Sequence, residues 1–308
     1  MSRQLVVGAG LIGGGVARRL AARGDDVVIA SRHGTAVDGA RALALDATDA
    51  EAFAAAAGGA ATIFLCTNPP YTRWPTDWPP VFAAAIDAAT RSGAGLVIMS
   101  NLYGYGPPEG PMTEDSPELS TETKGRVRLA GWHAALAAHE RGDIRAVEVR
   151  ASDYFGPGAT GTAHLGESFF HAAEKSKTAR VVGDPALPHS WSYLPDIVST
   201  LIAAADYEGA WGRVWHVPSG QPRARTVIME QLNEHYGGHG RVAGYPQWVL
   251  RALAAVSPLM REIEASSYQF RMPFVIDSAQ TERLLGVSAT GWLEALTTTA
   301  DTYRSARH

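Results

Sequence analysis

Short hydrophobic runs alternate with alanine-rich stretches through the first half of the chain. The runs QLVVG, DVVIA, TIFLC, GLVIMS and AVEVR are apolar throughout or nearly so, which is typical of strands that helices cover on both faces. The stretches between them, LIGGGVARRLAARG, DAEAFAAAA, PPVFAAAIDAATRSG and KGRVRLAGWHAALAAHERG, have helical character, and several end at a glycine. This alternation predicts an α/β fold built on a doubly wound parallel sheet.

The second half of the chain has a different texture. After about Ser152, loops rich in glycine, proline and aromatic residues predominate. Further helices are expected around residues 194–206, 224–236, 278–286 and 290–304. No charged run or Gly/Ser linker separates the halves. We therefore expect a sheet domain of residues 1–155, with about 188–217 returning to the sheet, and a smaller C-terminal substrate cap of residues 156–187 and 218–308.

The composition is that of an ordinary packed protein. Of the 308 residues, 46% are hydrophobic and 19% are charged. The formal net charge of -4 gives no electrostatic reason to expect nucleic acid or an anionic membrane as a partner. No apolar run approaches the roughly 20 residues needed to cross a bilayer. The single cysteine, Cys66, fits a reducing compartment, and MSRQLVVGAG lacks the apolar region of a signal peptide, so we expect a soluble cytoplasmic protein.

A glycine-rich loop follows the first predicted strand. In VVGAGLIGGGVARRL, Gly8, Gly10 and Gly13 have the spacing G-x-G-x-x-G at the start of a helix. In such a loop the first glycine permits a tight turn, the second lets the backbone approach a pyrophosphate, and the third allows close packing of helix on strand. The motif alone is weak, and its bland alternative is a turn without a ligand. Its place in the first βαβ unit predicts a Rossmann-type domain that binds a dinucleotide.

The end of the second predicted strand bears on the choice of cofactor. A site that prefers NAD usually carries an acidic residue there for the ribose diol, whereas VVIASRHG has Ser31 and Arg32. An arginine can pair bidentately with a 2′-phosphate. Alternatively, Arg32 is a solvated loop residue. The pattern favours NADP(H), with NAD(H) still possible.

Further segments follow the glycine loop in a recognisable order. These are LALDATD with Asp46 and Ala47, FLCTNPPY with residues 66–68, MSNLYGYGP, RASDYFGPG with Tyr154, and SWSYLPDIVSTL. In order and spacing they resemble the extended, and more narrowly the atypical, short-chain dehydrogenase/reductases, which are often described as NAD-dependent epimerases/dehydratases. The resemblance implies that Asp46 faces the adenine and that the loop at residues 66–68 follows the nicotinamide ribose. Members commonly dimerise through the helix containing Lys124, so we expect a homodimer.

The chain departs from this family at its catalytic positions. The family uses a tyrosine as acid/base, a lysine four residues later that holds the ribose, and a serine that orients the carbonyl. In TETKGRVRLAGW the Tyr-x-x-x-Lys pair aligns with Lys124 and Arg128, and aligning Tyr105 with the family's Tyr-Gly puts Asn101 at the serine. The resemblance therefore implies the helix and the facing cofactor groove, but not the usual proton donor.

The replacements could still perform parts of this chemistry. Arg128 could hydrogen-bond the ribose hydroxyls, and Asn101 could donate to a carbonyl oxygen. Lys124, with its pKa lowered by burial and by a neighbouring cation, could act as a general acid. Tyr103, Tyr105 and Tyr154 are nearby phenols that could supply the proton instead. The alternative for Lys124 and Arg128 is a solvated helix face that pairs with phosphate or with Glu122.

Other candidates point less strongly to a function. His235 and His239 are four apart, but no carboxylate or cysteine has metal-ligand spacing, so no metal is expected. PYTRWPTDWPP and LPHSWSYLPD are interpreted as loops at the ligand side of the sheet, where they could form an apolar or aromatic substrate wall or simply pack against the cap. His189 stands where nucleotide-sugar relatives commonly carry a phosphate-clamping arginine, which weakens the case for a UDP-sugar substrate.

The leading hypothesis is an NADP-dependent oxidoreductase that transfers a hydride to or from a small, fairly apolar carbonyl or enone. The alternatives are an epimerase or dehydratase and a cofactor-binding sensor without turnover. The predicted catalytic residues are Lys124, Asn101, Tyr103 and Tyr105. The predicted cofactor contacts are Gly8, Gly10, Leu11, Ile12, Gly13, Ser31, Arg32, Asp46, Ala47, Cys66, Thr67, Asn68, Arg128 and Tyr154.

Overall fold

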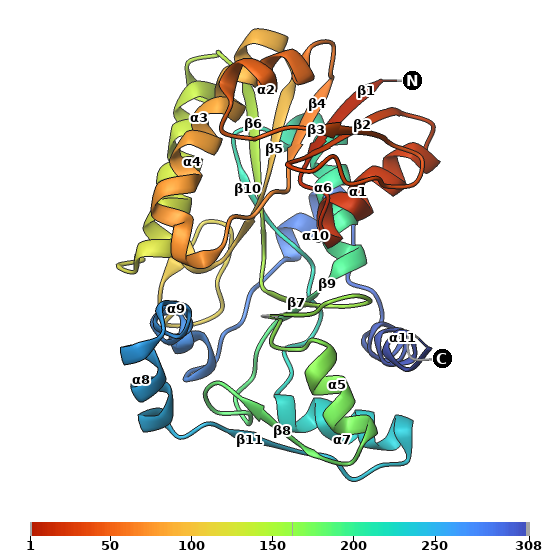
Figure 1. Ribbon diagram of the computed structural model, residues 1–308, viewed down its shortest axis with the longest axis vertical. Coiled ribbons are helices and arrows are strands. Elements are labelled where there is room, and N and C mark those ends of the chain that lie inside the picture. The colour runs from red at the N-terminus through yellow and green to blue at the C-terminus, as the bar shows by residue number, and fades with distance from the viewer. Residues whose placement is uncertain (1, 162, 306–308) are drawn as a thin grey trace.

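A parallel sheet of seven strands forms the upper part of the molecule in Figure 1. The computed structural model describes residues 2–161 and 163–305. The strand order is β10-β6-β5-β4-β1-β2-β3, and each neighbouring pair runs parallel. The strands are β1 Arg3–Val7, β2 Asp26–Ser31, β3 Arg41–Ala44, β4 Thr62–Leu65, β5 Gly95–Asn101, β6 Arg145–Ala151 and β10 Val214–His216. The predicted α/β fold is therefore confirmed.

Helices cover both faces of this sheet. One face carries α2 Ala50–Ala57, α3 Trp74–Ser92 and α4 Thr123–Glu140, and the other carries α1 Leu11–Ala22, α6 Leu194–Asp206 and α10 Ala279–Leu285. Alternate strand residues point to opposite layers, so Leu5 and Val7 belong to one hydrophobic core and Val6 to the other. Burial on both faces explains why the strands are continuous hydrophobic runs.

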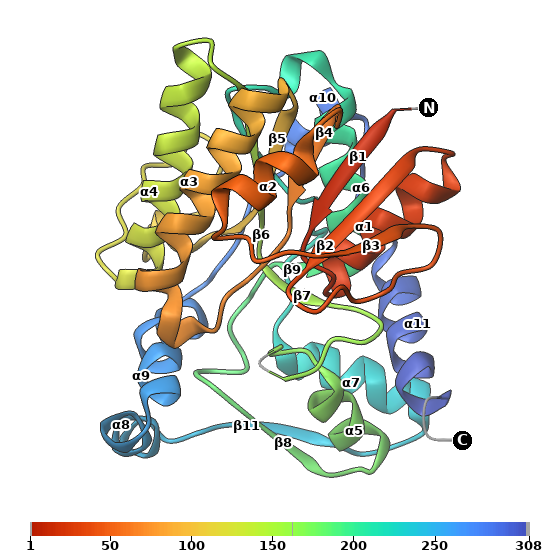
Figure 2. The same cartoon turned by 45° about the horizontal axis from the view of Figure 1, so that its top comes forward.

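The lower part of the molecule is a smaller unit with a third hydrophobic core. It contains α5 Glu167–Glu174, α7 Arg225–Tyr236, α11 Trp292–Ser305 and the parallel pair β8 Thr178–Val181 and β11 Arg241–Gly244. The helices α8 Gln247–Val256 and α9 Pro258–Ala265 lie apart from that core, beside the lower ends of α3 and α4 in Figure 2. Short 3-10 turns are η1 Tyr71–Arg73, η2 Tyr103–Tyr105, η3 Glu208–Ala210 and η4 Ser267–Phe270.

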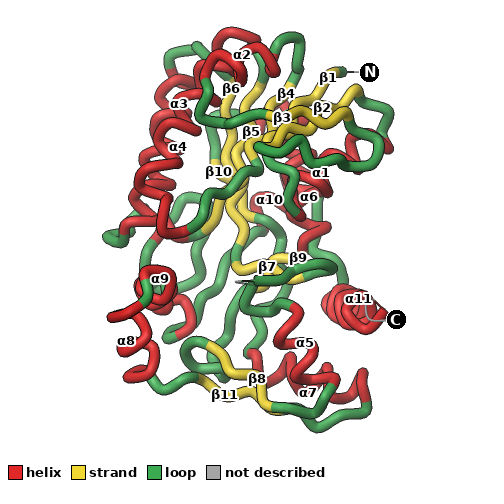
Figure 3. The backbone as a smooth tube through the Cα atoms, viewed as in Figure 1, coloured by secondary structure: helices red, strands yellow, loops and turns green. Residues whose placement is uncertain are grey.

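The segment expected to return to the sheet does so only in part. Its end, β10, pairs with β6, but β9 Trp191–Tyr193 pairs instead with β7 Asp153–Phe155 in a separate two-stranded ribbon. This ribbon and the surrounding loops lie between the sheet and the lower unit (Figure 3). In addition, α10, expected in the cap, packs against α6 and β10.

The segment PYTRWPTDWPP is not the loop that its prolines predict. It forms η1 and the first turns of α3, which includes Pro79 and Pro80. Interior prolines remove helix hydrogen bonds. Trp74 and Trp78, however, are four residues apart on one face of the helix, and each is only 1% exposed. Burial of two indole rings outweighs the unfavourable local propensity.

Candidate functional site

The three predicted glycines of the glycine loop have different surroundings. Gly8 has φ of +112°, and a Cβ there would lie 2.6 Å from the backbone nitrogen of Thr67. A Cβ at Gly13 would lie 1.9 Å from the carbonyl oxygen of Gly8, so helix α1 packs closely against the loop. A Cβ at Gly10 would meet nothing within 4 Å and would project into open space at the N-terminal end of α1.

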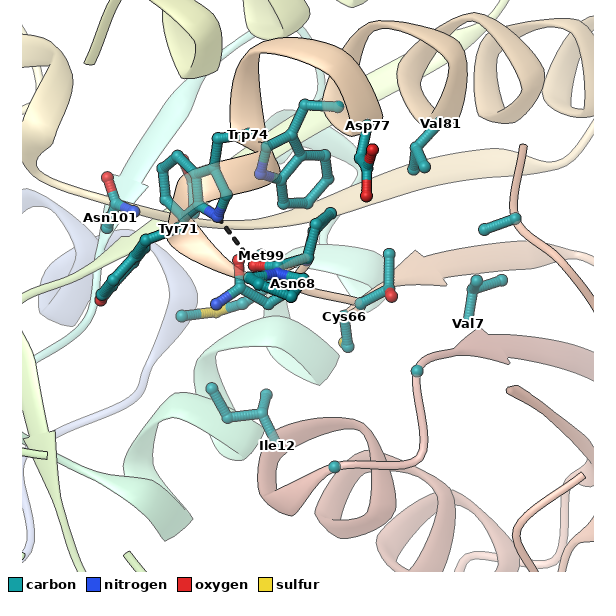
Figure 4. A pocket seen from close by; sticks show the side chains of 18 of the residues that line it. Val7, Ile12, Cys66, Asn68, Tyr71, Trp74, Asp77, Val81, Met99 and Asn101 are labelled. Atoms are coloured by element: carbon teal, nitrogen blue, oxygen red, sulfur yellow. Dashed lines mark hydrogen bonds between the residues drawn. The ribbon is translucent and has the colours of Figure 1, made fainter. Parts of the chain in front are cut away.

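A cavity of about 900 Å³ opens at this point and runs along the C-terminal ends of the strands. Figure 4 shows Val7 toward one end of the drawn lining and Tyr71 and Asn101 toward the other. The cavity brings together nearly all of the predicted cofactor contacts: Gly8, Gly10, Leu11, Ile12, Ser31, Arg32, Asp46, Ala47, Cys66, Thr67, Asn68, Arg128 and Tyr154.

Ser31 and Arg32, at and after the end of β2, line this cavity together with Asp46, and we call these three residues the ribose corner. The backbone N–H of Thr35 donates to Ser31 Oγ at 2.9 Å and fixes the turn. The backbone N–H and the hydroxyl of Thr48 donate to Asp46, and together with the nearby Arg32 they lower the pKa of that carboxyl. Arg32 is exposed and free to meet a ligand. The corner therefore offers one cation and one ionised acid.

Cys66 follows β4 and lies in the wall of the cavity. Burial raises the pKa of its thiol to about 12. The thiol is therefore neutral at physiological pH, and Cys66 is a small lining residue rather than a nucleophile.

Asn101, at the end of β5, also lies in the cavity wall. Its Oδ1 accepts a hydrogen bond of 3.1 Å from the backbone N–H of Tyr103. With Oδ1 engaged in this way, the side-chain amide is held in a fixed orientation and its NH₂ is available as a donor.

Two phenols meet beside Asn101. The hydroxyls of Tyr71 and Tyr103 are 3.2 Å apart, and both residues line the cavity. Burial raises the pKa of Tyr71 above its ordinary value and that of Tyr103 well above it. Both phenols are therefore protonated at neutral pH, which is the form that can donate a proton to a substrate oxygen.

The other two candidate phenols have different surroundings. Tyr154 lines the cavity, where burial raises its pKa. Tyr105 does not line it, because its hydroxyl lies 2.8 Å from His216 Nε2 and its ring lies against the guanidinium of Arg150. Tyr103 and Tyr105 therefore belong to the same short turn but face different environments.

Arg128 lines the cavity and is held tightly against its wall. Its Nη2 donates to the carbonyl of Met99, its Nε donates to Ser100 Oγ at 3.3 Å, and its guanidinium lies 4.3 Å from the centre of the Trp78 ring. Burial lowers the pKa of Arg128 to about 10, so the side chain remains charged at neutral pH. The alternative of a solvated helix face is wrong for this residue, which is only 4% exposed.

Lys124 is buried too, but it does not line the cavity. Its ammonium donates to the carbonyl of Glu262 and, at 3.2 Å, to Ser266 Oγ. It is also 3.8 Å from a carboxylate oxygen of Glu122 and 3.6 Å from one of Glu262. Burial lowers its pKa, and these two carboxylates oppose that effect. The alternative of a solvated face is wrong here as well, although pairing with Glu122 is observed.

The cavity includes residues that the sequence analysis did not single out. Asp153 follows β6, and its Oδ2 lies 2.9 Å from His189 Nε2. Burial alone would raise the pKa of Asp153, but His189 holds it below its ordinary value. The position of Asp153 at a strand end was a usable signal. Gln269 also lines the cavity, and nothing in the local sequence around it connects it to this site. Tyr71 and Trp74, from the segment PYTRWPTDWPP that was predicted as a possible aromatic wall, line the cavity as well.

Within residues 2–161 and 163–305, no three His, Cys, Asp or Glu side chains gather closely enough to hold a metal ion. His235, one of the histidines considered above, contacts Asp301 at 2.8 Å. No helix of the described chain is long and apolar enough to span a membrane.

The chain resembles one protein family over most of its length. The profile of the "NAD dependent epimerase/dehydratase family" matches residues 4–217, about two thirds of the chain. The chain belongs to this family. This confirms the resemblance seen in the sequence motifs, while no curated protein sequence matches the chain.

Several proteins of known structure share the whole fold. MoeE5, solved with UDP-glucose and NAD, is 20% identical with a TM-score of 0.82, and the match covers 100% of both chains. An epimerase from Methanothermobacter thermautotrophicus is 19% identical with a TM-score of 0.83 over 99% of this chain and 93% of that one. UDP-glucose 4-epimerase from Thermotoga maritima is 15% identical with a TM-score of 0.82 over 99% and 100%. At these identities the likeness establishes the fold.

Proposed function

We propose that the cavity binds NAD(P) and that the protein transfers a hydride between this cofactor and a carbinol or carbonyl carbon of a small substrate. One observation carries the proposal. Gly10 opens onto the cavity at the N-terminal end of α1, where a pyrophosphate would meet unpaired backbone N–H groups. The same cavity continues past the ribose corner to the polar groups of Asn101 and Tyr103.

When bound, the nicotinamide ring supplies or accepts the hydride. The Asn101 amide is then the donor that polarises a substrate carbonyl, because its Oδ1 is already engaged by the backbone of Tyr103. On reduction of a carbonyl the phenol of Tyr103, hydrogen-bonded to that of Tyr71, gives the proton to the substrate oxygen, and on oxidation of a carbinol the same oxygen, as phenolate, takes the proton back. We assign this role to the phenols rather than to Lys124 or Tyr105, because the latter two do not reach the cavity wall.

The substrate that suits this end of the cavity is small and uncharged. The rings of Tyr71, Trp74 and Tyr154 offer apolar surface. The Asp153 carboxylate has one oxygen on His189 and can accept a hydrogen bond from a substrate donor through the other. A diphosphate would need cations close by. Two arginines of the lining lie near this end, but Arg73 is paired with Asp77 at 2.9 Å and Arg128 is held by Met99, Ser100 and Trp78. Gln269, the lining residue that the capping part contributes, is uncharged.

Two candidate activities, that of an epimerase or dehydratase and that of a net oxidoreductase, differ in what becomes of the hydride. In an epimerase or dehydratase the substrate is oxidised and then reduced again, so the cofactor shows no net change. The family membership and the UDP-sugar enzymes among the structural neighbours favour this candidate. In a net oxidoreductase the reduced cofactor is consumed, and Arg32, a partner for the 2′-phosphate of NADP, favours that one.

One experiment separates these candidates. One set of mixtures contains the protein, NAD or NADP and uncharged alcohols, with UDP-glucose as the charged comparison. A second set contains the protein, NADH or NADPH and uncharged ketones and enones. Reduced cofactor is followed by absorbance, and the substrate stereocentres by NMR. A net gain or loss of reduced cofactor indicates an oxidoreductase. Inversion or dehydration of the substrate with no net change in reduced cofactor indicates an epimerase or dehydratase. Failure of both cofactors to bind would overturn the proposal.

A further inference from the structure

The helices α8 and α9 precede η4, whose Gln269 lines one side of the cavity, and these two helices have very little hydrophobic support. Of the residues in α8 and α9, all of which lie in the described chain, Leu250 alone is buried. Trp248 is 72% exposed and Val256 is 81% exposed. A segment with so few buried apolar contacts is expected to open at low cost in free energy. Within residues 257–270, all of which are described, Phe270 of η4 is the one buried apolar residue, so the attachment of α9 itself depends on other interactions.

Lys124 provides such an attachment. From the first turn of α4, its ammonium donates to the carbonyl of Glu262, in the last turn of α9, and to the hydroxyl of Ser266, the residue after that helix. A cation at a helix C-terminus meets the negative end of the helix dipole. The Glu262 carboxylate, 3.6 Å away, adds an ion pair. Three groups of one short segment therefore converge on this single ammonium.

The same ammonium lies against the phenol pair of the cavity. Lys124 Nζ is 5.2 Å from the centre of the Tyr71 ring and 5.6 Å from that of Tyr103. At these distances a cation is attracted to the ring faces. Both rings belong to the sheet domain, one in η1 and the other in η2. Lys124 therefore joins the wall that carries the proposed proton donor to the segment that closes the cavity.

The tethered segment continues directly into cavity residues. Ser266 is followed by η4, in which Gln269 lines the cavity. The next residue, Phe270, stacks on the His189 ring at a centroid distance of 4.8 Å, and His189 in turn holds Asp153. Moving the end of α9 would therefore displace Gln269 and disturb the surroundings of Asp153.

We propose that Lys124 is a positioning residue that fixes the capping segment, residues 257–270, onto the Tyr71–Tyr103 wall and so completes the substrate end of the cavity. The substrate-binding part of this inference rests on the proposed function, whereas the tether itself does not. A role as general acid, the earlier hypothesis for Lys124, would require an ammonium at the cavity surface. The observed one is 1% exposed and points to α9.

The test compares Lys124→Met, which keeps an unbranched apolar stem but removes the charge, with Lys124→Arg, which keeps the cation. Lys177→Met, at an exposed position, is the matched control. Amide hydrogen exchange across residues 257–270 is measured with cofactor absent. We expect exchange there to be at least about tenfold faster in Lys124→Met, unchanged in Lys177→Met and largely restored in Lys124→Arg. Unchanged exchange in Lys124→Met overturns the tether.

Kinetics then separate positioning from acid catalysis. Using a substrate found in the panel above, we expect Lys124→Met to raise KM more than it lowers kcat, with NAD(P) affinity within about twofold of the parent because the glycine loop is distant. A lower kcat with unchanged KM and unchanged exchange would restore Lys124 as the acid. Should Lys124→Met not fold, Ser266→Ala removes one acceptor of the same ammonium and is subject to the same exchange criterion. If no substrate is found, the exchange result still decides the tether.

Discussion

The two ends of the cavity are built in different ways. At the glycine-loop end, the lining residues follow strands whose side chains are buried in two large cores, and Gly8 and Gly13 leave no space for another atom. At the substrate end, Gln269 comes from a segment in which α9 has no buried residue and a single buried ammonium makes the main polar contacts. The first end is expected to be the more rigid because the elements that support it are buried, whereas the second depends on few buried contacts.

The strongest test of this difference is a change at the rigid end. Gly10→Val places a side chain in the space assigned to the pyrophosphate, so cofactor binding is expected to be lost while the fold is retained. Calorimetric titration with NADH and NADPH measures the loss, and circular dichroism checks the fold. Gly110→Val is the matched control, because a Cβ there also meets nothing within 4 Å but lies outside the cavity. Normal affinity in a folded Gly10→Val protein would mean that the cofactor lies elsewhere.

The substrate end is tested by removing one hydroxyl. Tyr103→Phe is expected to lower turnover by about 10²–10⁴-fold while cofactor affinity stays near that of the parent, since it removes only the proposed proton donor. Tyr105→Phe removes a buried hydroxyl from the same turn but outside the cavity, so its turnover should stay within a few fold. If the two variants lose turnover equally, the effect is structural and Tyr103 is not the donor.

A smaller effect is expected at the ribose corner. Arg32→Asp should weaken NADPH binding by about 1–3 kcal/mol relative to NADH, because it removes a charged contact and adds repulsion. Titration with both cofactors measures this difference, and Arg18→Ala, an exposed arginine on α1, is the control. Equal affinities of the parent protein for NADH and NADPH would show that Arg32 does not contact the 2′-phosphate, and the case for NADP over NAD would then be lost.

The smallest effect concerns the pH dependence of stability. Asp153 has a lowered pKa in the folded protein, so its contribution is fully present above its ordinary pKa of about 4 and is lost as pH falls through the folded value. Asp153→Asn should therefore lower the free energy of unfolding at neutral pH, and the difference from the parent should shrink at acid pH. Denaturant unfolding at several pH values measures it. A difference that does not change with pH would show that the charge of Asp153 is not responsible.

The contrast between the two ends also explains what could be read from the sequence. Gly8, Gly10 and Arg32 follow strands whose hydrophobic pattern is unambiguous, so their meeting in space follows from the parallel topology. Asp46 follows the short, largely exposed strand β3, which the pattern did not predict, and it was placed by the resemblance to the family. The loop at residues 66–68 was likewise placed by the resemblance, although it too lies at the end of a predicted strand. The glycine-loop end could therefore be located from strand ends together with the family motifs.

The substrate end could not be located in the same way. The helix of Lys124 was predicted, but the direction of its ammonium depends on α9, which begins more than a hundred residues later and gave no recognisable pattern. Tyr103 and Tyr105 lie two residues apart in one turn, and the different positions of their hydroxyls follow from the packing of Tyr105 against His216 and Arg150. Such long-range packing has no local signature.

The central claim is that a hydride moves within this cavity. The most direct test uses reduced cofactor carrying deuterium at C4 of the nicotinamide, incubated with the protein and a panel of uncharged ketones and enones, with products examined by NMR. We predict deuterium on a product carbon with the parent protein, and far less with Tyr103→Phe at equal cofactor occupancy. Normal cofactor binding with no deuterium in any product, and no inversion or dehydration of the alcohols tested with oxidised cofactor, would contradict the claim and indicate a cofactor-binding protein without turnover.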